Sequence, residues 1–221
     1  MTALDWPGCA NARDLGGLPT SWGGKITTGA LVRADRLRRE TVHAALAYGV
    51  NLVLDLRLAH TECTVDPSPL AGHPAYRNIS VLRDEDTVLE EMADGLPAIY
   101  RAILDRGGAN LARVLAAIAW APPGGVLVHC HSGKDRTGLV VALALDVAGV
   151  SPDEIAVDYA RTAERLPMEP AAAAQVTVQT MLQTLGYLRE QYGGAQPYLM
   201  RAGFGRADVT RLRARLTRPA G

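Results

Sequence analysis

Short apolar runs alternate with segments of helical periodicity along this chain of 221 residues. Apolar or β-branched runs bounded by glycine and polar residues predict buried strands, and longer Leu-, Val- and Ala-rich segments predict helices. Strands are expected at residues 25–28, 30–33, 51–56, 75–82 and 125–128. Helices are expected at residues 40–48, 96–105, 109–120, 138–147, 171–192, 196–202 and 206–216.

The order of these elements predicts the fold class. Strands separated by helices indicate an α/β domain with a central, mostly parallel sheet flanked by helices. The pair Gly107-Gly108 is expected to separate two helices, and Ser151 followed by Pro152 is typical of a helix start. With 48% hydrophobic residues the chain can bury a full core, so we expect one domain over residues 1–221 with extra C-terminal helices.

Composition removes several classes of function. Lys plus Arg and Asp plus Glu both number 23, and aromatic residues are few, so the sequence does not favour a nucleic-acid partner. The three cysteines show no metal-ligand spacing, so we expect no metal site. They cannot all pair in disulfides, which predicts reduced thiols and a cytoplasmic protein. No apolar run approaches the ~20 residues of a membrane span, and no signal peptide is evident; export without one stays open.

The most informative segment holds Cys130 and Arg136, separated by five residues that include Gly133. The cysteine follows the predicted strand 125–128, and a predicted helix comes soon after the arginine. Amides of such a loop, with the helix dipole, form an anion cradle that favours a thiolate nucleophile. The planar fork of Arg136 can hold two oxygens of a phosphoryl group. The combination predicts a phosphatase that works through a phosphocysteine.

These residues resemble the loop of the cysteine-dependent protein tyrosine phosphatase superfamily, in which Cys, five residues and Arg are followed by Ser or Thr. Cys130, Arg136 and Thr137 occupy those positions. The Gly-Lys-Asp-Arg-Thr-Gly ending is similar to a bacterial tyrosine phosphatase branch related to lipid phosphatases. Further matches to that branch come in the family's order at residues 11–17, 31–35 and 54–57, although Ala12 and Ala34 replace an aromatic residue and a serine.

The resemblance covers most of the chain and implies a phosphotyrosine phosphatase-like fold without a cofactor. It implies that the substrate is a phosphorylated protein, with phosphotyrosine and also phosphoserine or phosphothreonine as targets, or a phosphoinositide. Cys130 is then the nucleophile and Arg136 holds the equatorial oxygens. The predicted substrate-binding residues are His131, Ser132, Gly133, Lys134 and Thr137. Thr137 is expected to donate a hydrogen bond to the departing thiolate or to cap the helix. Gly133 is expected to let the backbone turn without a side chain that blocks the pocket.

The general acid is the least determined assignment. No Trp-Pro-Asp sequence precedes the cysteine, and the branch that this chain resembles uses the aspartate inside the loop, which is Asp135. An acid must first reach the leaving oxygen, so we favour Asp135 although Lys134 and Arg136 flank it. Asp84 or Asp86 is the alternative, with Asp94 a more distant candidate.

Other charged residues surround the loop. Lys134 at the rim favours ligands with more than one phosphate, unless it only pairs with Asp135. Asp55 and Arg57 are expected to brace the loop from behind, and His129 is expected to be structural. Arg13 and Arg33 are expected either to add positive charge near the loop or to form internal ion pairs. Residues 171–174 are expected to precede either a lid over the pocket or ordinary core helices.

Two other classes of function remain open. A phospholigand-binding module would keep Arg136 and the amide cradle but would show no turnover. A sulfur-transfer enzyme or arsenate reductase would need a different loop or a resolving cysteine, and neither Cys9 nor Cys63 has an obvious relay spacing. Either thiol could instead form a protective disulfide with an oxidised Cys130, or be a spectator. The sequence does not predict an oligomeric state.

Overall fold

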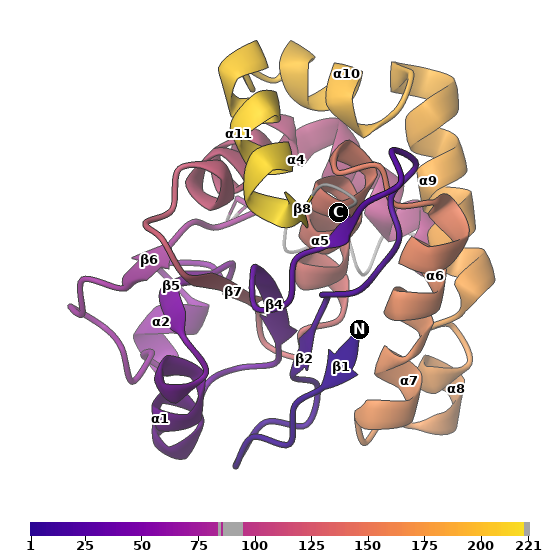
Figure 1. Cartoon of the computed structure of the whole chain (residues 1–221). Coiled ribbons are helices and arrows are strands. Elements are labelled where there is room, and N and C mark those ends of the chain that lie inside the picture. Colours follow the sequence, from indigo (N-terminus) through magenta and orange to yellow (C-terminus); the bar gives the residue numbers. More distant parts are fainter. Residues whose placement is uncertain (84, 86–94, 219–221) are drawn as a thin grey trace.

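A six-stranded sheet lies at the centre of the computed structural model, which describes residues 1–83, 85 and 95–218 (Figure 1). The strand order is β1-β2-β4-β7-β5-β6; β4, β7, β5 and β6 run parallel, and β1 and β2 join antiparallel at one edge. The predicted α/β class is therefore confirmed. The strands are β1 (Thr2–Ala3), β2 (Arg13–Asp14), β4 (Leu31–Ala34), β5 (Val50–Asp55), β6 (Tyr76–Asn78) and β7 (Gly125–His129). A separate two-stranded sheet pairs β3 (Lys25–Ile26) with β8 (Thr217–Arg218).

Helices cover both faces of the sheet. The helices within the described residues are α1 (Arg39–Ala47), α2 (Glu62–Val65), α4 (Leu96–Ala119), α5 (Asp135–Val147), α6 (Pro152–Ala160), α7 (Thr162–Arg165), α8 (Pro170–Ala173), α9 (Val178–Tyr192), α10 (Ala195–Arg201) and α11 (Arg206–Leu216). Within the described ranges, none of the helices is both long and apolar enough to traverse a bilayer.

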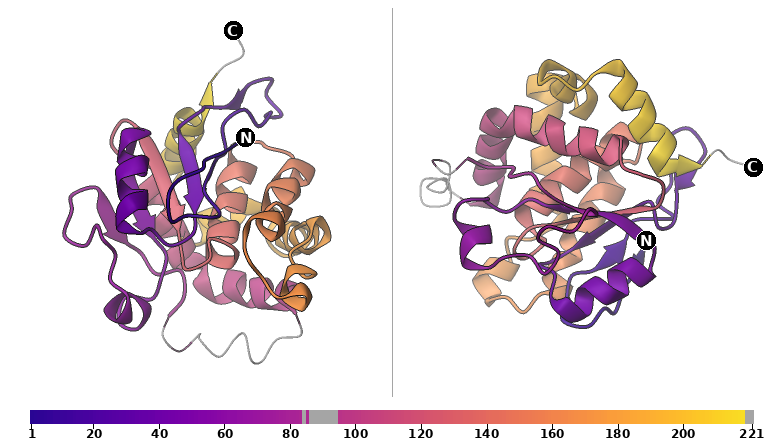
Figure 2. Two further views of the ribbon diagram at one scale, coloured as in Figure 1. Left: turned by 90° about the horizontal axis from the view of Figure 1, so that it is seen from below. Right: turned by 90° about the vertical axis from the view of Figure 1, so that its left-hand side faces the viewer.

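Alternation along β7 divides the core between the two faces. Val126 and Val128 pack in the large cluster that contains residues of α4 and α5, whereas Leu127 packs in a smaller cluster with residues of α1. The right-hand view in Figure 2 shows α1 on one side of the sheet and α4 on the other. Because successive side chains of a strand point to opposite faces, Cys130 continues the Val128 face and joins the large cluster, whereas His129 faces the other way.

Residues 96–119 form one continuous helix, so the predicted break at Gly107-Gly108 is wrong. Both glycines serve close packing. A Cβ at Gly107 would lie 3.2 Å from the carbonyl oxygen of Val81, and one at Gly108 would lie 3.4 Å from the Tyr198 hydroxyl. The small residues therefore let α4 approach its neighbours, and this packing offsets the roughly 1 kcal/mol that glycine costs inside a helix.

Other predicted boundaries shift. The strand predicted at residues 75–82 is only β6, and the helix predicted at residues 171–192 divides into α8 and α9. The division follows a local signal, because the Thr177 side chain accepts a hydrogen bond from the Thr180 amide (3.1 Å) and caps α9. The predicted cap of α6 is confirmed, since the Ser151 hydroxyl accepts from the Glu154 amide (3.3 Å).

Candidate active site

Cys130 lies where the carboxyl end of β7 opens into a loop that leads to α5. Its neighbouring parallel strand β5 ends level with it, because Asp55 is in register with His129. The thiol residue is 2% exposed, and α5 begins at Asp135, three residues earlier than predicted, so Arg136 stands in the first helical turn. The cysteine, the loop and the positive end of a thirteen-residue helix therefore meet at one sheet edge, as the sequence predicts.

The outer side of this loop is held by hydrogen bonds to three successive carbonyl oxygens, those of residues 131–133. The Arg36 amide donates to the first (2.9 Å), and the Asn11 side chain donates to the second and third (3.1 and 3.2 Å). The Arg33 guanidinium also donates to the third (2.6 Å). Because the carbonyl and the next N–H of a trans peptide point in opposite directions, this anchoring turns the amides of residues 132–134 toward the opposite side, where an anion can bind.

Gly133 supports the same turn, as predicted. Its φ is +68°, and a Cβ there would lie 2.3 Å from the carbonyl oxygen of Ala34. A side chain at this position would therefore collide with the end of β4, and its effect on the pocket stays a prediction. Glycine lets the loop pack directly on that strand.

Arg13 and Arg33 form internal ion pairs beneath the loop, both with Asp158 of α6. The contacts measure 2.7 and 2.6 Å, and all three residues are at most 1% exposed. Burial opposes the charge of Asp158, but the two guanidinium groups hold its pKa below the usual value. Two cations that share one carboxylate leave one net positive charge among these side chains, which favours an anion in the loop.

Arg136 is paired with Glu62 of α2, a residue that sequence reasoning missed. Both terminal nitrogens of the guanidinium contact the carboxylate, with 2.9 Å between Nη2 and Oε1. Glu62 also accepts from the Leu58 amide (2.8 Å), and although burial opposes its charge, these hydrogen bonds lower its pKa. A guanidinium bound through its two terminal nitrogens keeps its Nε edge for a second anion, so Glu62 can orient Arg136 without blocking it.

Asp135 sits at the loop with its carboxylate partly exposed (24%). Its Oδ1 accepts a hydrogen bond from the Tyr100 hydroxyl (2.6 Å), and its Oδ2 lies 3.6 Å from the Lys134 ammonium. The predicted Lys134–Asp135 pair is therefore present. The alternative acids Asp84, Asp86 and Asp94 lie outside the described residues.

Thr137 of α5 and His129 of β7 each hold a buried polar group that lacks a hydrogen-bond partner within the described part of the chain. The hydroxyl of Thr137 is one, and since no side chain caps α5, the predicted capping role is wrong. The second is Nε2 of His129, whose Nδ1 lies 3.0 Å from the Cys130 carbonyl oxygen. Burial lowers the pKa of His129, so it stays neutral and fits the structural role predicted for it.

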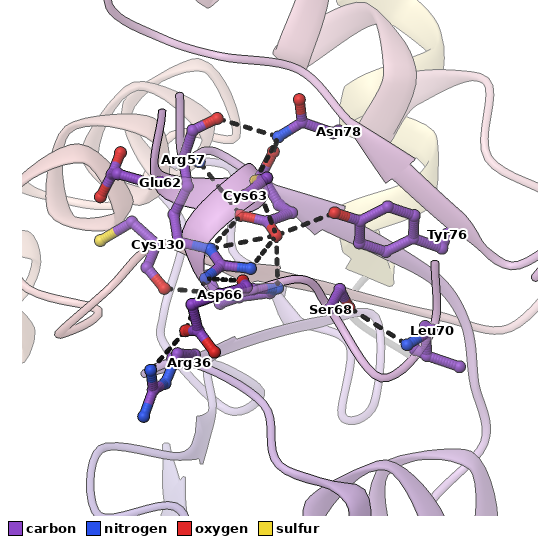
Figure 3. A network of polar contacts seen from close by, with 12 residues as sticks. Arg36, Arg57, Glu62, Cys63, Asp66, Ser68, Leu70, Tyr76, Asn78 and Cys130 are labelled. Carbon is purple, nitrogen blue, oxygen red and sulfur yellow. Dashed lines mark hydrogen bonds and ion pairs between the residues drawn. The ribbon is translucent and has the colours of Figure 1, made fainter. Parts of the chain in front are cut away.

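Asp55 and Arg57 form a buried pair (2.7 Å) behind the loop, and the Tyr76 hydroxyl donates to the same carboxylate (2.9 Å). Arg57 extends the network to Asp66, which also contacts Arg36 (Figure 3). Arg36 in turn anchors the loop through its amide. The network thus reaches the loop through backbone contacts, and bracing by Asp55 and Arg57 stays a prediction.

A cleft of about 760 Å³ opens beside the loop. The loop contributes His131, Ser132 and Lys134 to its lining, and the segment between α7 and α8 forms another wall. The remaining lining residues include Trp6, Cys9, Asp35, Arg36 and Arg38. The C-terminal helices therefore contribute to the surroundings of the loop, and whether they move as a lid stays a prediction.

The three thiols are free and have different surroundings. Cys9 donates to Asp35 (2.7 Å), and burial together with that carboxylate raises the pKa of its thiol. Burial also raises the pKa of Cys63. Both environments disfavour a reactive thiolate. Among the described residues, no group of three or more His, Cys, Asp or Glu side chains could hold a metal ion.

Comparison with known proteins relates this geometry to a family. Residues 4–218 match the model of the tyrosine phosphatase family. A tyrosine-protein phosphatase of Nostoc commune is 33% identical in a match that covers 85% of this chain and 71% of that protein. The triple specificity protein phosphatase PtpB of Mycobacterium tuberculosis is also 33% identical, over 52% of this chain and 51% of its own length. The four motifs around Cys130 and this match over nearly the whole chain lead to one conclusion: the chain belongs to the tyrosine phosphatase family.

Proposed function

We propose that this protein hydrolyses phosphomonoesters through a phosphocysteine intermediate, with phosphotyrosine in proteins as the principal substrate. The observation that carries the proposal is the outward anchoring of the loop carbonyls around a buried Cys130, with Arg136 at the helix start. Inward amides, a helix N-terminus and a guanidinium supply fixed positive charge where a phosphoryl group gains negative charge in the transition state.

The proposed reaction has two displacements. Sγ of ionised Cys130 attacks phosphorus, the S–P bond forms, and the P–O bond to the leaving group breaks while Asp135 gives its proton to that oxygen. Water then attacks phosphorus, the S–P bond breaks, and Asp135 takes the proton from the water. The hydroxyl of Thr137, which has no hydrogen-bond partner among the described residues, can donate to the departing sulfur in this step.

Turnover of para-nitrophenyl phosphate and of a phosphotyrosyl peptide by the purified protein tests the proposal. We expect both to release inorganic phosphate. Tight binding of phosphopeptide without phosphate release would instead identify a binding module. The M. tuberculosis relative is named a triple specificity phosphatase, which supports including phosphoseryl, phosphothreonyl and phosphoinositide substrates in the same assay.

Replacing Asp135 with asparagine is expected to slow the hydrolysis of substrates with poor leaving groups far more than that of substrates with good ones. A general acid matters in proportion to the basicity of the oxygen that it protonates, and its loss costs about 10²-fold or more. Phosphotyrosyl peptide and phenyl phosphate should lose most of their kcat, and an activated aryl phosphate should lose little. An equal loss for every leaving group would show that Asp135 only holds the loop, and the same series on Asp84→Asn and Asp86→Asn would then locate the acid.

Lys134→Met is expected to lower kcat/KM for a phosphoinositide with several phosphates about tenfold more than for a phosphotyrosyl peptide. Lys134 lies at the loop rim and lines the cleft, where a second phosphate could approach its ammonium group. A hydrogen bond between an ammonium and a phosphate is stronger than one between neutral groups. Lys134→Arg is the matched control, because it keeps the charge. If both substrates lose the same factor, Lys134 acts through its contact with Asp135 and does not select substrates.

A further inference from the structure

Two buried tyrosines form a hydrogen-bonded chain that ends on Asp135. The Tyr100 hydroxyl of α4 lies 2.6 Å from Oδ1 of Asp135 and 2.6 Å from the Tyr159 hydroxyl of α6. Tyr100 is 0% exposed and Tyr159 is 1% exposed. Burial and the negative charge of Asp135 raise the pKa of Tyr100 well above its usual value, so its hydroxyl keeps its proton.

The chemistry of the three groups sets the direction of the chain. An ionised carboxylate can only accept, and a tyrosine hydroxyl has a single proton to donate. The Tyr100 proton therefore points to Asp135, and Tyr159 donates to the oxygen of Tyr100. Hydrogen bonds in such a chain strengthen one another.

The packing of the rings makes this geometry rigid. The two tyrosine rings meet edge to face, with centroids 6.0 Å apart and planes at 89°. A Cβ at Gly138 would lie 3.2 Å from Cδ2 of Tyr159, so the glycine in α5 makes room for that ring. Helices α4 and α6 thus meet the start of α5 through these side chains.

We propose that Tyr100 is a positioning residue that selects which oxygen of Asp135 carries the transferable proton. Because the Tyr100 hydroxyl donates to Oδ1, that oxygen remains the acceptor, and the transferable proton resides on Oδ2, the oxygen on the Lys134 side at the loop rim. After transfer, the same hydrogen bond stabilises the carboxylate that must take a proton from water. This inference rests on the proposed function, in which Asp135 protonates the leaving oxygen.

Tyr100→Phe tests the inference, since it removes one hydroxyl and keeps the ring. With phosphotyrosyl peptide, whose leaving phenol has a pKa of about 10, kcat should fall about tenfold, the scale of a lost hydrogen bond to a charged group. KM should stay unchanged, and an activated aryl phosphate should be hydrolysed at nearly the normal rate. The Tyr100→Phe/Asp135→Asn double variant should be no slower than Asp135→Asn alone, because Tyr100 acts through Asp135.

Two further variants separate positioning from stability. Tyr198→Phe removes another buried hydroxyl, which donates to the Leu104 carbonyl (2.6 Å), and should lower thermal stability without changing the leaving-group dependence. Tyr159→Phe removes only the hydroxyl farthest from Asp135 in the hydrogen-bonded chain. It should change kcat in the same direction as Tyr100→Phe but by less. This variant tests the inference if Tyr100→Phe folds poorly.

Three results would overturn the inference. The first is an equal loss of kcat for all leaving groups in Tyr100→Phe, and the second is a further loss in the double variant. The third is an unchanged leaving-group dependence in Asp135→Asn while the wild type turns over; this result would leave the phosphocysteine mechanism intact. Absence of turnover by the wild-type protein would overturn the proposed function itself and the inference with it.

Discussion

Replacing Cys130 with serine is expected to abolish phosphate release, with a loss in kcat on the order of 10⁶-fold, the scale seen when a covalent nucleophile is removed. The hydroxyl is close in size to the thiol, and the residue is almost fully buried, so the loop should keep its shape. Oxygen at this position stays protonated at neutral pH, because the field of the loop ionises a thiol far more readily than an alcohol. Steady-state release of phosphate from a phosphotyrosyl peptide measures the effect.

The serine variant should still bind phosphorylated ligand, because the amides and Arg136 are untouched. Isothermal titration with the phosphotyrosyl peptide and a thermal melt serve as controls for a folded site. Cys63→Ser is the matched control substitution, and we expect it to leave turnover near the wild-type rate. Substantial hydrolysis by Cys130→Ser would contradict the phosphocysteine mechanism.

Arg136→Lys is expected to lower kcat by about 10³-fold, the range found when a guanidinium or oxyanion donor is lost from a transition state. An ammonium cannot hold two oxygens of the phosphoryl group in one plane. It also cannot reproduce the two contacts that the guanidinium makes with Glu62. The hold on the phosphoryl oxygens counts most in the transition state, so kcat should fall more than KM rises.

The control for this variant is Arg101→Lys, which changes an arginine of α4 that lies over the Tyr187 ring (5.4 Å). We expect wild-type kinetics from it. Kinetics of Arg136→Lys that resemble the wild type would remove Arg136 from the role of holding the oxygens, and a rise in KM alone would limit that role to ground-state binding.

Much of the fold follows from patterns that are local in sequence. The apolar run before Cys130 predicts β7, and the periodicity of residues 206–216 predicts α11 with the bounds observed. Errors arise where tertiary packing decides. Gly107 is a breaker in isolation, but the helix continues through it because the glycine lets α4 approach the backbone at Val81.

The residues of the candidate site also divide into those that a local sequence pattern predicts and those that only the fold brings together. Cys130, Asp135 and Arg136 lie close together in the sequence, so they can be recognised as one motif. Glu62 reaches Arg136 from 74 residues away, with no periodic or spacing signal that marks it. Tyr100 stands on the apolar face of α4, where it is indistinguishable from an ordinary core residue until the fold brings its hydroxyl to Asp135.

Asp158 is a partial exception among the missed residues. It lies on the face of α6 that also carries Ile155 and Tyr159, both of which are buried. A carboxylate on a buried helix face needs cationic partners, so the pattern could have linked it to Arg13 and Arg33. The distances that show this pairing come only from the fold.

Rapid-quench trapping of the enzyme during its first turnover of a radiolabelled phosphotyrosyl peptide would detect the phosphocysteine itself. We predict that labelled phosphoryl appears on the proteolytic fragment that contains Cys130 before phosphate is released, and that Cys130→Ser carries no label. Label on a fragment without Cys130, or label that persists in Cys130→Ser, would contradict it.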